Sequence, residues 1–242
     1  MPEQNLAAIW VYLSTTPLLG LTATLIAYGI AYRIYIRFKA NPLLHPVALS
    51  VVFLITLLLL TETPYSAYFE GAQFVHFLLG PATVALAVPL YQQWAKLKQL
   101  WLPISLTLVT GVIVGALSSI GLARLFGAGI QTQLSLAPKS VTAPVAMGIA
   151  EKIGGLPSLT AVFVVTTGIL GAAIGTRLFS LMRIRDESIQ GFAMGLTAHG
   201  IGTARAFQVS KEMGAFSGLA MALATFTTAF ILPWLLGWLG LP

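Results

Sequence analysis

The sequence predicts an all-α polytopic membrane protein. Of its 242 residues, 57% are hydrophobic and 8% are charged, whereas soluble domains carry about 25% charged residues. So few charged side chains cannot cover the surface of a soluble globule. The chain also contains a series of apolar segments, each close to the roughly 20 residues that a helix needs to cross a bilayer. Cysteine is absent, which excludes disulfides, iron–sulfur clusters and cysteine-type zinc sites.

Five apolar segments predict uninterrupted transmembrane helices: residues 17–37, 43–62, 101–123, 158–182 and 213–240. Residues 6–16 are too short to cross before Pro17, so we expect them to lie in the interface or to extend the first helix. The start of the chain lacks the basic region of a secretory signal, so the first apolar stretch is expected to stay as a span.

Three further apolar segments are interrupted: residues 66–93, 131–153 and 189–209. Glycine, proline or polar residues stand near the middle of each. Backbone that leaves the helix at membrane depth is tolerated only where protein or a water-filled cavity satisfies its polar groups. Discontinuous helices of this kind are typical of substrate sites in transporters.

Basic clusters predict the orientation. The net charge of +6 is interpreted as orientation in the membrane and not as affinity for nucleic acid. The cytoplasmic clusters would be Arg33, Arg37 and Lys39, then Lys96 and Lys98, then Arg183 and Arg185. An even number of crossings must separate them, so 66–93 is expected to cross and 131–153 to form a re-entrant hairpin from the outer side. If 189–209 also crosses, the chain has about seven spans, with the N-terminus outside and the C-terminus inside.

An inverted repeat is also predicted. The segment Gly80–Val84 resembles Ala137–Val141, and a Leu-Pro pair opens the span that follows each of them. The repeat halves would be residues 43–127 and 131–240 within a single transmembrane domain covering residues 1–242. The alternative is chance similarity between apolar segments.

Two prolines suggest where an anion could bind. Pro81 and Pro138 are expected to start new helices, because proline is favoured in the first turn, and Thr83 and Ser140 would add hydroxyl groups. Helix N-termini near the bilayer midplane present free N–H groups and the positive end of the helix dipole. The alternative is a pair of proline kinks that bind nothing.

Three ionisable residues are expected inside the membrane: Lys139, His199 and Arg205. Such groups are costly in hydrocarbon and indicate function. The nearest carboxylates, Glu151 and Glu212, lie near segment ends, so the unmatched cations predict an anionic substrate. Alternatively, Lys139 and Arg205 extend to the interface, and His199 is a neutral core group bonded to a backbone carbonyl.

The glycines are of two kinds. Gly168, Gly171 and Gly175 have the spacing of helix packing, whereas the glycine-rich run 195–203 predicts an unwound loop that faces the ligand. The expected substrate-binding residues are therefore Pro81, Thr83, Pro138, Lys139, Ser140, Thr142, His199, Gly200, Gly202, Thr203 and Arg205.

The residues do not predict an enzyme. A Ser140–His199 pair would lack an orienting carboxylate, and the Gly-x-Ser-x-Gly motif is absent. The three histidines, His45, His76 and His199, are scattered without metal-ligand spacing. We expect no catalytic residue, metal or cofactor.

Several segments together resemble the LrgB/CidB family. They are Asn41–Leu44, Leu79–Ala85, Pro138–Ala146, Gly154–Ala161, Thr167–Gly171 and Ala198–Ala206. The resemblance covers most of residues 17–240. One small departure is Gly71-Ala72, where two glycines are expected.

This resemblance implies a multi-pass protein of the bacterial inner (cytoplasmic) membrane. It also implies that the protein is a member of the antiholin-like group. Members of this group are thought to modulate murein hydrolase export and lysis together with a small LrgA-type membrane partner. The resemblance also implies similarity to the plastid glycolate/glycerate translocator, whose C-terminal half is similar to this family.

The expected function is therefore secondary transport or export of small monocarboxylates of the glycolate, glycerate, lactate or pyruvate class. Besides the carboxylate and the LrgA-type protein, the expected partners are membrane lipid and a second copy of the chain, and no nucleic acid. The alternative is an antiholin-like structural regulator of a holin that transports nothing itself.

Overall fold

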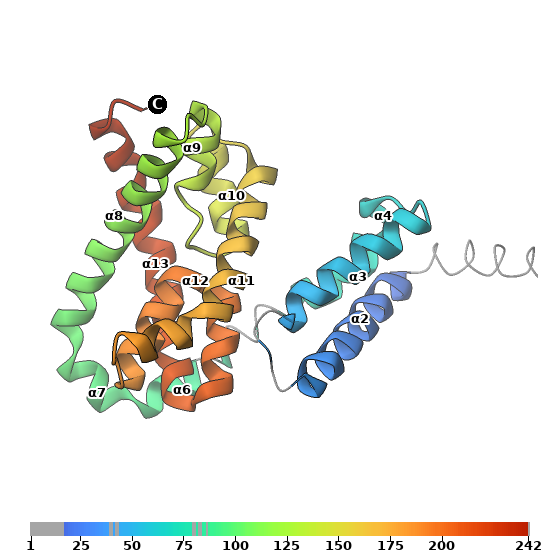
Figure 1. Ribbon diagram of the computed structural model, residues 1–242, viewed down its shortest axis with the longest axis horizontal. Helices are drawn as coiled ribbons and strands as arrows, with labels where there is room; N and C mark the ends of the chain where they lie inside the picture. The colour runs from blue at the N-terminus through green and yellow to red at the C-terminus, as the bar shows by residue number, and fades with distance from the viewer. Residues whose placement is uncertain are drawn as a thin grey trace, which may run out of the picture. The chain divides into compact units, whose positions relative to one another are not determined.

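The computed structural model describes residues 17–241, except 39–40, 42–43, 79–80, 82–83 and 86. The described residues form helices, turns and short connections, with no strand among them (Figure 1). The chain divides into two compact units, Met1–Ala85 and Leu86–Pro242.

The first unit contains α2 (Pro17–Arg37), α3 (Pro46–Leu60) and α4 (Tyr65–Phe77). Helix α2 packs against both of the others. A Cβ at Gly20 would collide with the carbonyl oxygen of Tyr68, so glycine allows α2 and α4 to approach closely. Thr24 Oγ1 lies 2.7 Å from the Tyr68 hydroxyl at the same contact.

Helix α3 is shorter than the predicted span 43–62. It starts at Pro46, which occupies the first turn. Its 15 residues extend about 22 Å, less than the roughly 30 Å of the hydrocarbon core. A complete crossing by this segment stays a prediction.

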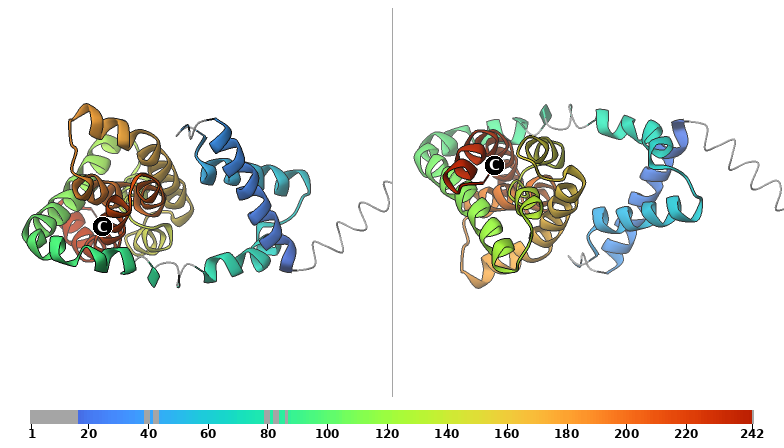
Figure 2. Two further views of the ribbon diagram at one scale, coloured as in Figure 1. Left: turned by 90° about the horizontal axis from the view of Figure 1, so that it is seen from below. Right: turned by 90° about the horizontal axis from the view of Figure 1, so that it is seen from above.

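The second unit contains the rest of the helices in the described part of the chain. They are α6 (Ala87–Gln92), α7 (Trp94–Gln99), α8 (Trp101–Leu125), α9 (Ile130–Leu136), α10 (Ala143–Lys152), α11 (Pro157–Leu181), α12 (Glu187–Val209) and α13 (Lys211–Trp238). Viewed end on, α13 lies inside this bundle (Figure 2), and it packs against α12, α8 and α6. The predicted broken segment 66–93 includes most of α4 and all of α6, and its residues 79–80, 82–83 and 86 lie outside the described residues.

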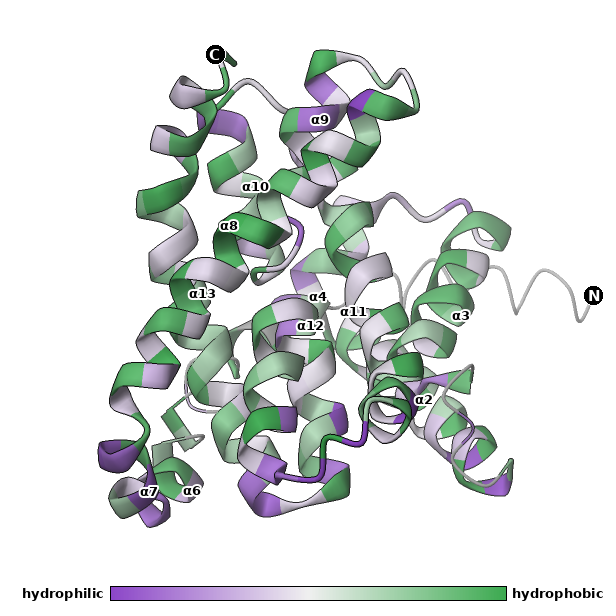
Figure 3. Cartoon of the chain, turned by 60° about the vertical axis from the view of Figure 1, so that its left-hand side comes forward, coloured by the Kyte–Doolittle hydropathy of each residue, from purple (hydrophilic) through white to green (hydrophobic). Residues whose placement is uncertain are grey.

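Among the described residues, four helices are long and apolar enough to cross a membrane: α2 from Leu18, α8, α11 and α13. They match four of the five predicted spans within a few residues. Large apolar side chains are exposed on them, including Trp234 at 84% and Leu181 at 81%. Hydrophilic residues gather instead at helix ends and connections (Figure 3). Exposed apolar surface of this extent requires lipid around it, so the chain is a membrane protein.

Helix α12 reverses direction at His199. This residue has φ 41° and ψ −133°, outside the helical region. Ser210 Oγ donates to Glu187 Oε2 at 2.6 Å, although a straight helix of 23 residues would separate its ends by about 34 Å. Residues 187–209, which we call the second hairpin, therefore begin and end at the same end of the unit.

This reversal overturns one part of the predicted topology. The prediction that residues 189–209 cross the membrane is wrong, and so is the prediction of a seventh span. The C-terminus lies at the end of the unit opposite to α6 and α7 (Figure 1), and not on the side of the Lys96 cluster as predicted.

An ion-pair network closes the base of the second hairpin. Lys96 Nζ lies 3.4 Å from Asp186 Oδ2 and 2.6 Å from Glu212 Oε1. The hydrogen bond to Glu212 is the main factor that raises the pKa of Lys96. The contact brings the connections before α8 and before α12 to one end of the unit, as the predicted even number of crossings between them requires.

Helices α9 and α10 form a first hairpin, residues 130–152, with a tip turn at residues 137–142. Their 7 and 10 residues extend about 10 and 15 Å, so neither spans the hydrocarbon core. The hairpin lies at the end of the unit where α8 ends and α11 begins (Figure 1). Its entry into a bilayer stays a prediction.

Candidate functional site

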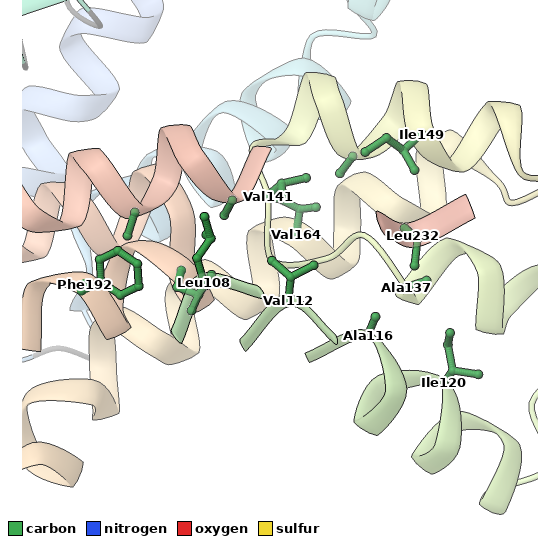
Figure 4. Packing of buried hydrophobic residues seen from close by; sticks show 14 of the residues in the cluster. Leu108, Val112, Ala116, Ile120, Ala137, Val141, Ile149, Val164, Phe192 and Leu232 are labelled. Atoms are coloured by element: carbon green, nitrogen blue, oxygen red, sulfur yellow. The ribbon is translucent and has the colours of Figure 1, made fainter. Parts of the chain in front are cut away.

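The tips of the two hairpins meet inside the second unit. The His199 ring Nε2 lies 2.9 Å from the carbonyl oxygen of Val164 on α11. Val164 packs beside Val141 of the tip turn (Figure 4). Ser140 of the tip turn and Leu196 of the second hairpin also line one small cavity. Two segments that the sequence predicted to be interrupted thus form one site.

Lys139 is the cation of this site. It lies in the tip turn, half-buried, and its Nζ is 3.5 Å from Ser140 Oγ. Within the described ranges no carboxylate pairs with it. A buried charge without a partner is costly, so an anion bound here would be stabilised.

Pro138 does not start a helix, contrary to the prediction. Helix α10 begins at Ala143, with Thr142 as N-cap and Pro144 in the first turn. Pro138 is fully buried in the tip turn, where its carbonyl accepts from the Val141 N–H at 3.2 Å. Pro144 takes the helix-starting role because its fixed φ and missing N–H suit the first turn.

The N-terminus of α10 still faces this turn. Thr142 is half-buried, and its side chain makes no capping hydrogen bond. The N–H groups of the first turn are therefore without a side-chain cap, which is the arrangement that binds anions at helix N-termini.

His199 is held by structural hydrogen bonds, which supports its alternative interpretation as a core group. It is 4% exposed. Thr203 Oγ1 donates to the His199 carbonyl at 2.8 Å and lies 2.9 Å from Ser217 Oγ. Thr203, also buried, therefore satisfies a carbonyl near the reversal, and its hydroxyl is engaged within the protein. A positive φ at a non-glycine residue is strained, and such strain often marks functional sites.

The predicted unwound loop at 195–203 is wrong in extent, because only His199 leaves the helix. A Cβ at Gly195 would collide with the Ser217 carbonyl, and one at Gly202 would lie 2.6 Å from Ala198 Cβ. These two glycines serve close packing. Gly200 differs, because it is exposed and a Cβ there would meet only Met221 Sδ, at 3.8 Å.

The packing role of Gly168, Gly171 and Gly175 is confirmed. Added Cβ atoms would press on His199, Ala198 and Met194 of α12, respectively. Helices α11 and α12 therefore approach closely through this face of α11.

Within the second unit, Arg205 lies away from the hairpin tips. Arg205 is six residues after His199, about 9 Å along the helix axis. Its Nη1 donates to Gln208 Oε1 at 3.0 Å. Pro81 is exposed and belongs to the first unit, and Thr83 lies outside the described residues. Their part in the site stays a prediction.

A small cavity lies against the tip turn. Its volume is about 20 Å³, and its wall includes Ser140, Leu196, Thr228 and two glycines of α8, Gly111 and Gly115. It has room for about one water molecule. Gly111, Gly115 and Thr228 were not predicted as site residues, although two glycines four residues apart in a predicted span were a visible signal. No cluster of three metal-ligating side chains occurs in the part of the chain that the structure describes.

These features define a helical membrane protein with several candidate spans and a half-buried lysine at the tip of a helical hairpin. The LrgB-like family model matches residues 24–238, and the chain belongs to this family.

Relatives of similar length support the assignment. The chain is 36% identical to the uncharacterized protein YwbG of Bacillus subtilis (strain 168), over 92% of this chain and 98% of that protein. It is 30% identical to the holin-like protein CidB of Staphylococcus epidermidis (87% and 91% covered) and 28% identical to the antiholin-like protein LrgB of Bacillus cereus (strain B4264; 93% and 98% covered). No solved structure matches the chain.

Proposed function

We propose that this protein is a secondary transporter or exporter of small monocarboxylates of the glycolate, glycerate, lactate or pyruvate class. The observation that carries the proposal is Lys139, a half-buried cation without a carboxylate partner in the described ranges, beside the uncapped N-terminus of α10. A small anion would satisfy both groups at once.

The arrangement of the hairpins supports transport over simple binding. Helices α8 and α11 each have 25 residues, and a hairpin of 23 residues follows each one. This pattern favours an inverted repeat of residues 101–152 and 157–209, in place of the halves 43–127 and 131–240. Inverted repeats that meet at a central site are typical of alternating-access transporters.

In the bacterial inner membrane, the positive-inside rule would place Lys96, Lys98, Arg183 and Arg185 in the cytoplasm. The first hairpin would then enter from outside and the second from the cytoplasm. Lipid would surround the exposed apolar faces, while a second copy of the chain and an LrgA-type small membrane protein remain candidate partners. Transport, and not catalysis, would be the activity, with no metal or cofactor. Altered export of a metabolic acid would link transport to murein hydrolase control and lysis.

The second candidate is an antiholin-like regulator of a holin without transport of its own. The printed names of two relatives, holin-like CidB and antiholin-like LrgB, favour it. A pure regulator, however, gives Lys139 no role. It would act through protein contacts, and any flux it allowed would be a leak that does not saturate with substrate.

The test is uptake of labelled glycolate, glycerate, lactate and pyruvate into proteoliposomes, with and without an LrgA-type partner. We expect the uptake to be saturable. Lys139→Gln should weaken substrate binding by about 2 kcal/mol, which is roughly thirtyfold in affinity. Lys152→Gln is the matched control, because Lys152 is an exposed lysine at the far end of α10, the helix that follows the tip turn. Arg205→Gln tests whether the second predicted cation contributes.

The outcomes separate the two candidates. Flat uptake of all four acids by folded protein would rule out the transporter. Leakage without saturation would favour the holin-related regulator. Equal binding by the Lys139→Gln and Lys152→Gln variants would remove Lys139 from the site.

A further inference from the structure

Thr228 presents an unsatisfied hydroxyl to the small cavity beside the tip turn. The residue lies on α13, is 5% exposed, and lines the cavity. No hydrogen bond involving its side chain occurs in the described part of the chain. The hydroxyl of Thr225, one turn earlier on α13, instead donates to the Met221 carbonyl at 2.9 Å. A polar group that lines a small cavity and has no protein partner is normally satisfied by a water or a ligand group, and the Thr228 hydroxyl has room for such a partner in this cavity.

The wall of the cavity carries a second hydroxyl, that of Ser140. An ideal Cβ built on Gly115 would have Ser140 Oγ as its nearest neighbour, at 4.0 Å. Glycine at this position therefore keeps open the space in front of Ser140. Figure 4 shows the apolar part of the same wall, with Val112 and Ala116 of α8 facing Ala137 and Val141 of the tip turn.

The cavity adjoins the cation. Ser140 Oγ is 3.5 Å from Lys139 Nζ, so one small acid can place its carboxylate at Lys139 and its next group at Ser140. The cavity volume of about 20 Å³ accommodates one water-sized group and not an extended chain.

We propose that this cavity is the specificity subsite for the part of the substrate next to the carboxylate. Thr228 and Ser140 bind one hydroxyl or oxo group, and Gly115 leaves the space for it. The subsite selects two- or three-carbon hydroxy or oxo acids over unsubstituted acids and over longer acids. This inference rests on the proposed transport function and assigns residues within the same site.

The experiment compares glycolate with acetate, which lacks the hydroxyl group, as competitors of uptake in proteoliposomes containing the full chain. Thr228→Val removes the hydroxyl at nearly constant volume. Because a net hydrogen bond changes affinity about three- to tenfold, we expect the preference for glycolate over acetate to fall by that factor. Thr228→Ser keeps the hydroxyl and should retain the preference. Thr225→Val is the control, since its hydroxyl bonds within its own helix.

Gly115→Ala tests the size limit. The new methyl group meets open space and no backbone, so the variant should fold, and its methyl would take up most of the cavity. We expect lactate to lose at least tenfold more affinity than acetate. Gly121→Ala is the control on the same helix, because a Cβ there has nothing within 4 Å.

The results distinguish this subsite from the function on which it rests. Wild-type uptake with unchanged selectivity in Thr228→Val and Gly115→Ala would overturn the subsite and leave the transporter intact. Absence of uptake of any acid by folded wild-type protein would overturn both. Loss of selectivity in Thr225→Val or Gly121→Ala as well would show a general effect of altered helices, and would also overturn the subsite.

Discussion

Gly168→Ala should destabilise the protein through the His199 ring. The added Cβ would lie 2.7 Å from His199 Cε1 and 2.9 Å from Nε2, well inside van der Waals contact. The ring is buried and bonded to the Val164 carbonyl, so it cannot move aside without losing that bond.

The expected cost combines two effects. Overpacking a core costs about 1–3 kcal/mol, and a buried polar group left unsatisfied costs about 1–3 kcal/mol. Because ring displacement relieves part of the overpacking, we expect about 2–4 kcal/mol in total. The assay is denaturant unfolding of purified protein in detergent, with Gly121→Ala as control. That control should be neutral or stabilising by up to about 1 kcal/mol, since alanine is the better helix former.

A double-mutant cycle makes the reasoning refutable. In a His199→Ala background the ring is absent, so Gly168→Ala should cost at least 1 kcal/mol less than it does in the wild type. Costs that add within about 0.5 kcal/mol would show that the two residues do not interact. The close approach of α11 to the second hairpin would then need another cause.

Three further predictions concern the second hairpin and its base. Gly195→Ala, which collides with the Ser217 carbonyl, should cost about 2–4 kcal/mol in the same unfolding assay. Gly200→Ala, whose Cβ would make an ordinary contact with Met221 Sδ at 3.8 Å, should change stability by less than about 1 kcal/mol. Similar costs for the two variants would argue against the packing role of Gly195. A hydrogen bond from the Ser188 hydroxyl, helped by the Ile189 N–H and Lys96, lowers the pKa of Asp186 to about 2, below its unfolded value of about 3.9. The resulting stabilisation is complete above pH about 4 and is lost as the pH falls towards 2. Because the Asp186 side chain is 45% exposed, the stabilisation should amount to only about 1 kcal/mol. Asp186→Asn should remove this pH dependence of stability. Because the chain has no native cysteine, single cysteines introduced after Leu97 and after Leu241 can be labelled with an impermeant reagent. The two cysteines should react from opposite sides of the membrane. Labelling of both from the same side would show that residues 189–209 cross the membrane after all.

Hydropathy was sufficient to predict the long helices but not the direction of α12. A window of apolar residues reports how much helix is buried in lipid, and residues 187–209 have enough length for one crossing or for two half-crossings. The reversal depends on a single left-handed residue, His199, and on the contact between Ser210 and Glu187 that closes the base. The glycines near His199 indicated a break, but Gly195 serves packing against α13 and Gly202 serves packing between the two arms of the second hairpin. Local sequence does not contain either contact.

The site shows the same division between local and long-range information. Lys139 could be identified from sequence because an isolated cation in an apolar segment is costly wherever the segment folds. The choice between Pro138 and Pro144 as helix start could not, since both satisfy the local rule and only the packing of the tip turn buries Pro138. Thr228 was invisible for a related reason: a threonine in a membrane helix usually bonds to its own backbone, as Thr225 does. The Thr228 hydroxyl can bind a substrate group only because α8 and the tip turn enclose a cavity beside it. That contact is formed by segments far apart in the sequence, and it is where a hydroxy or oxo acid would be distinguished from an unsubstituted one.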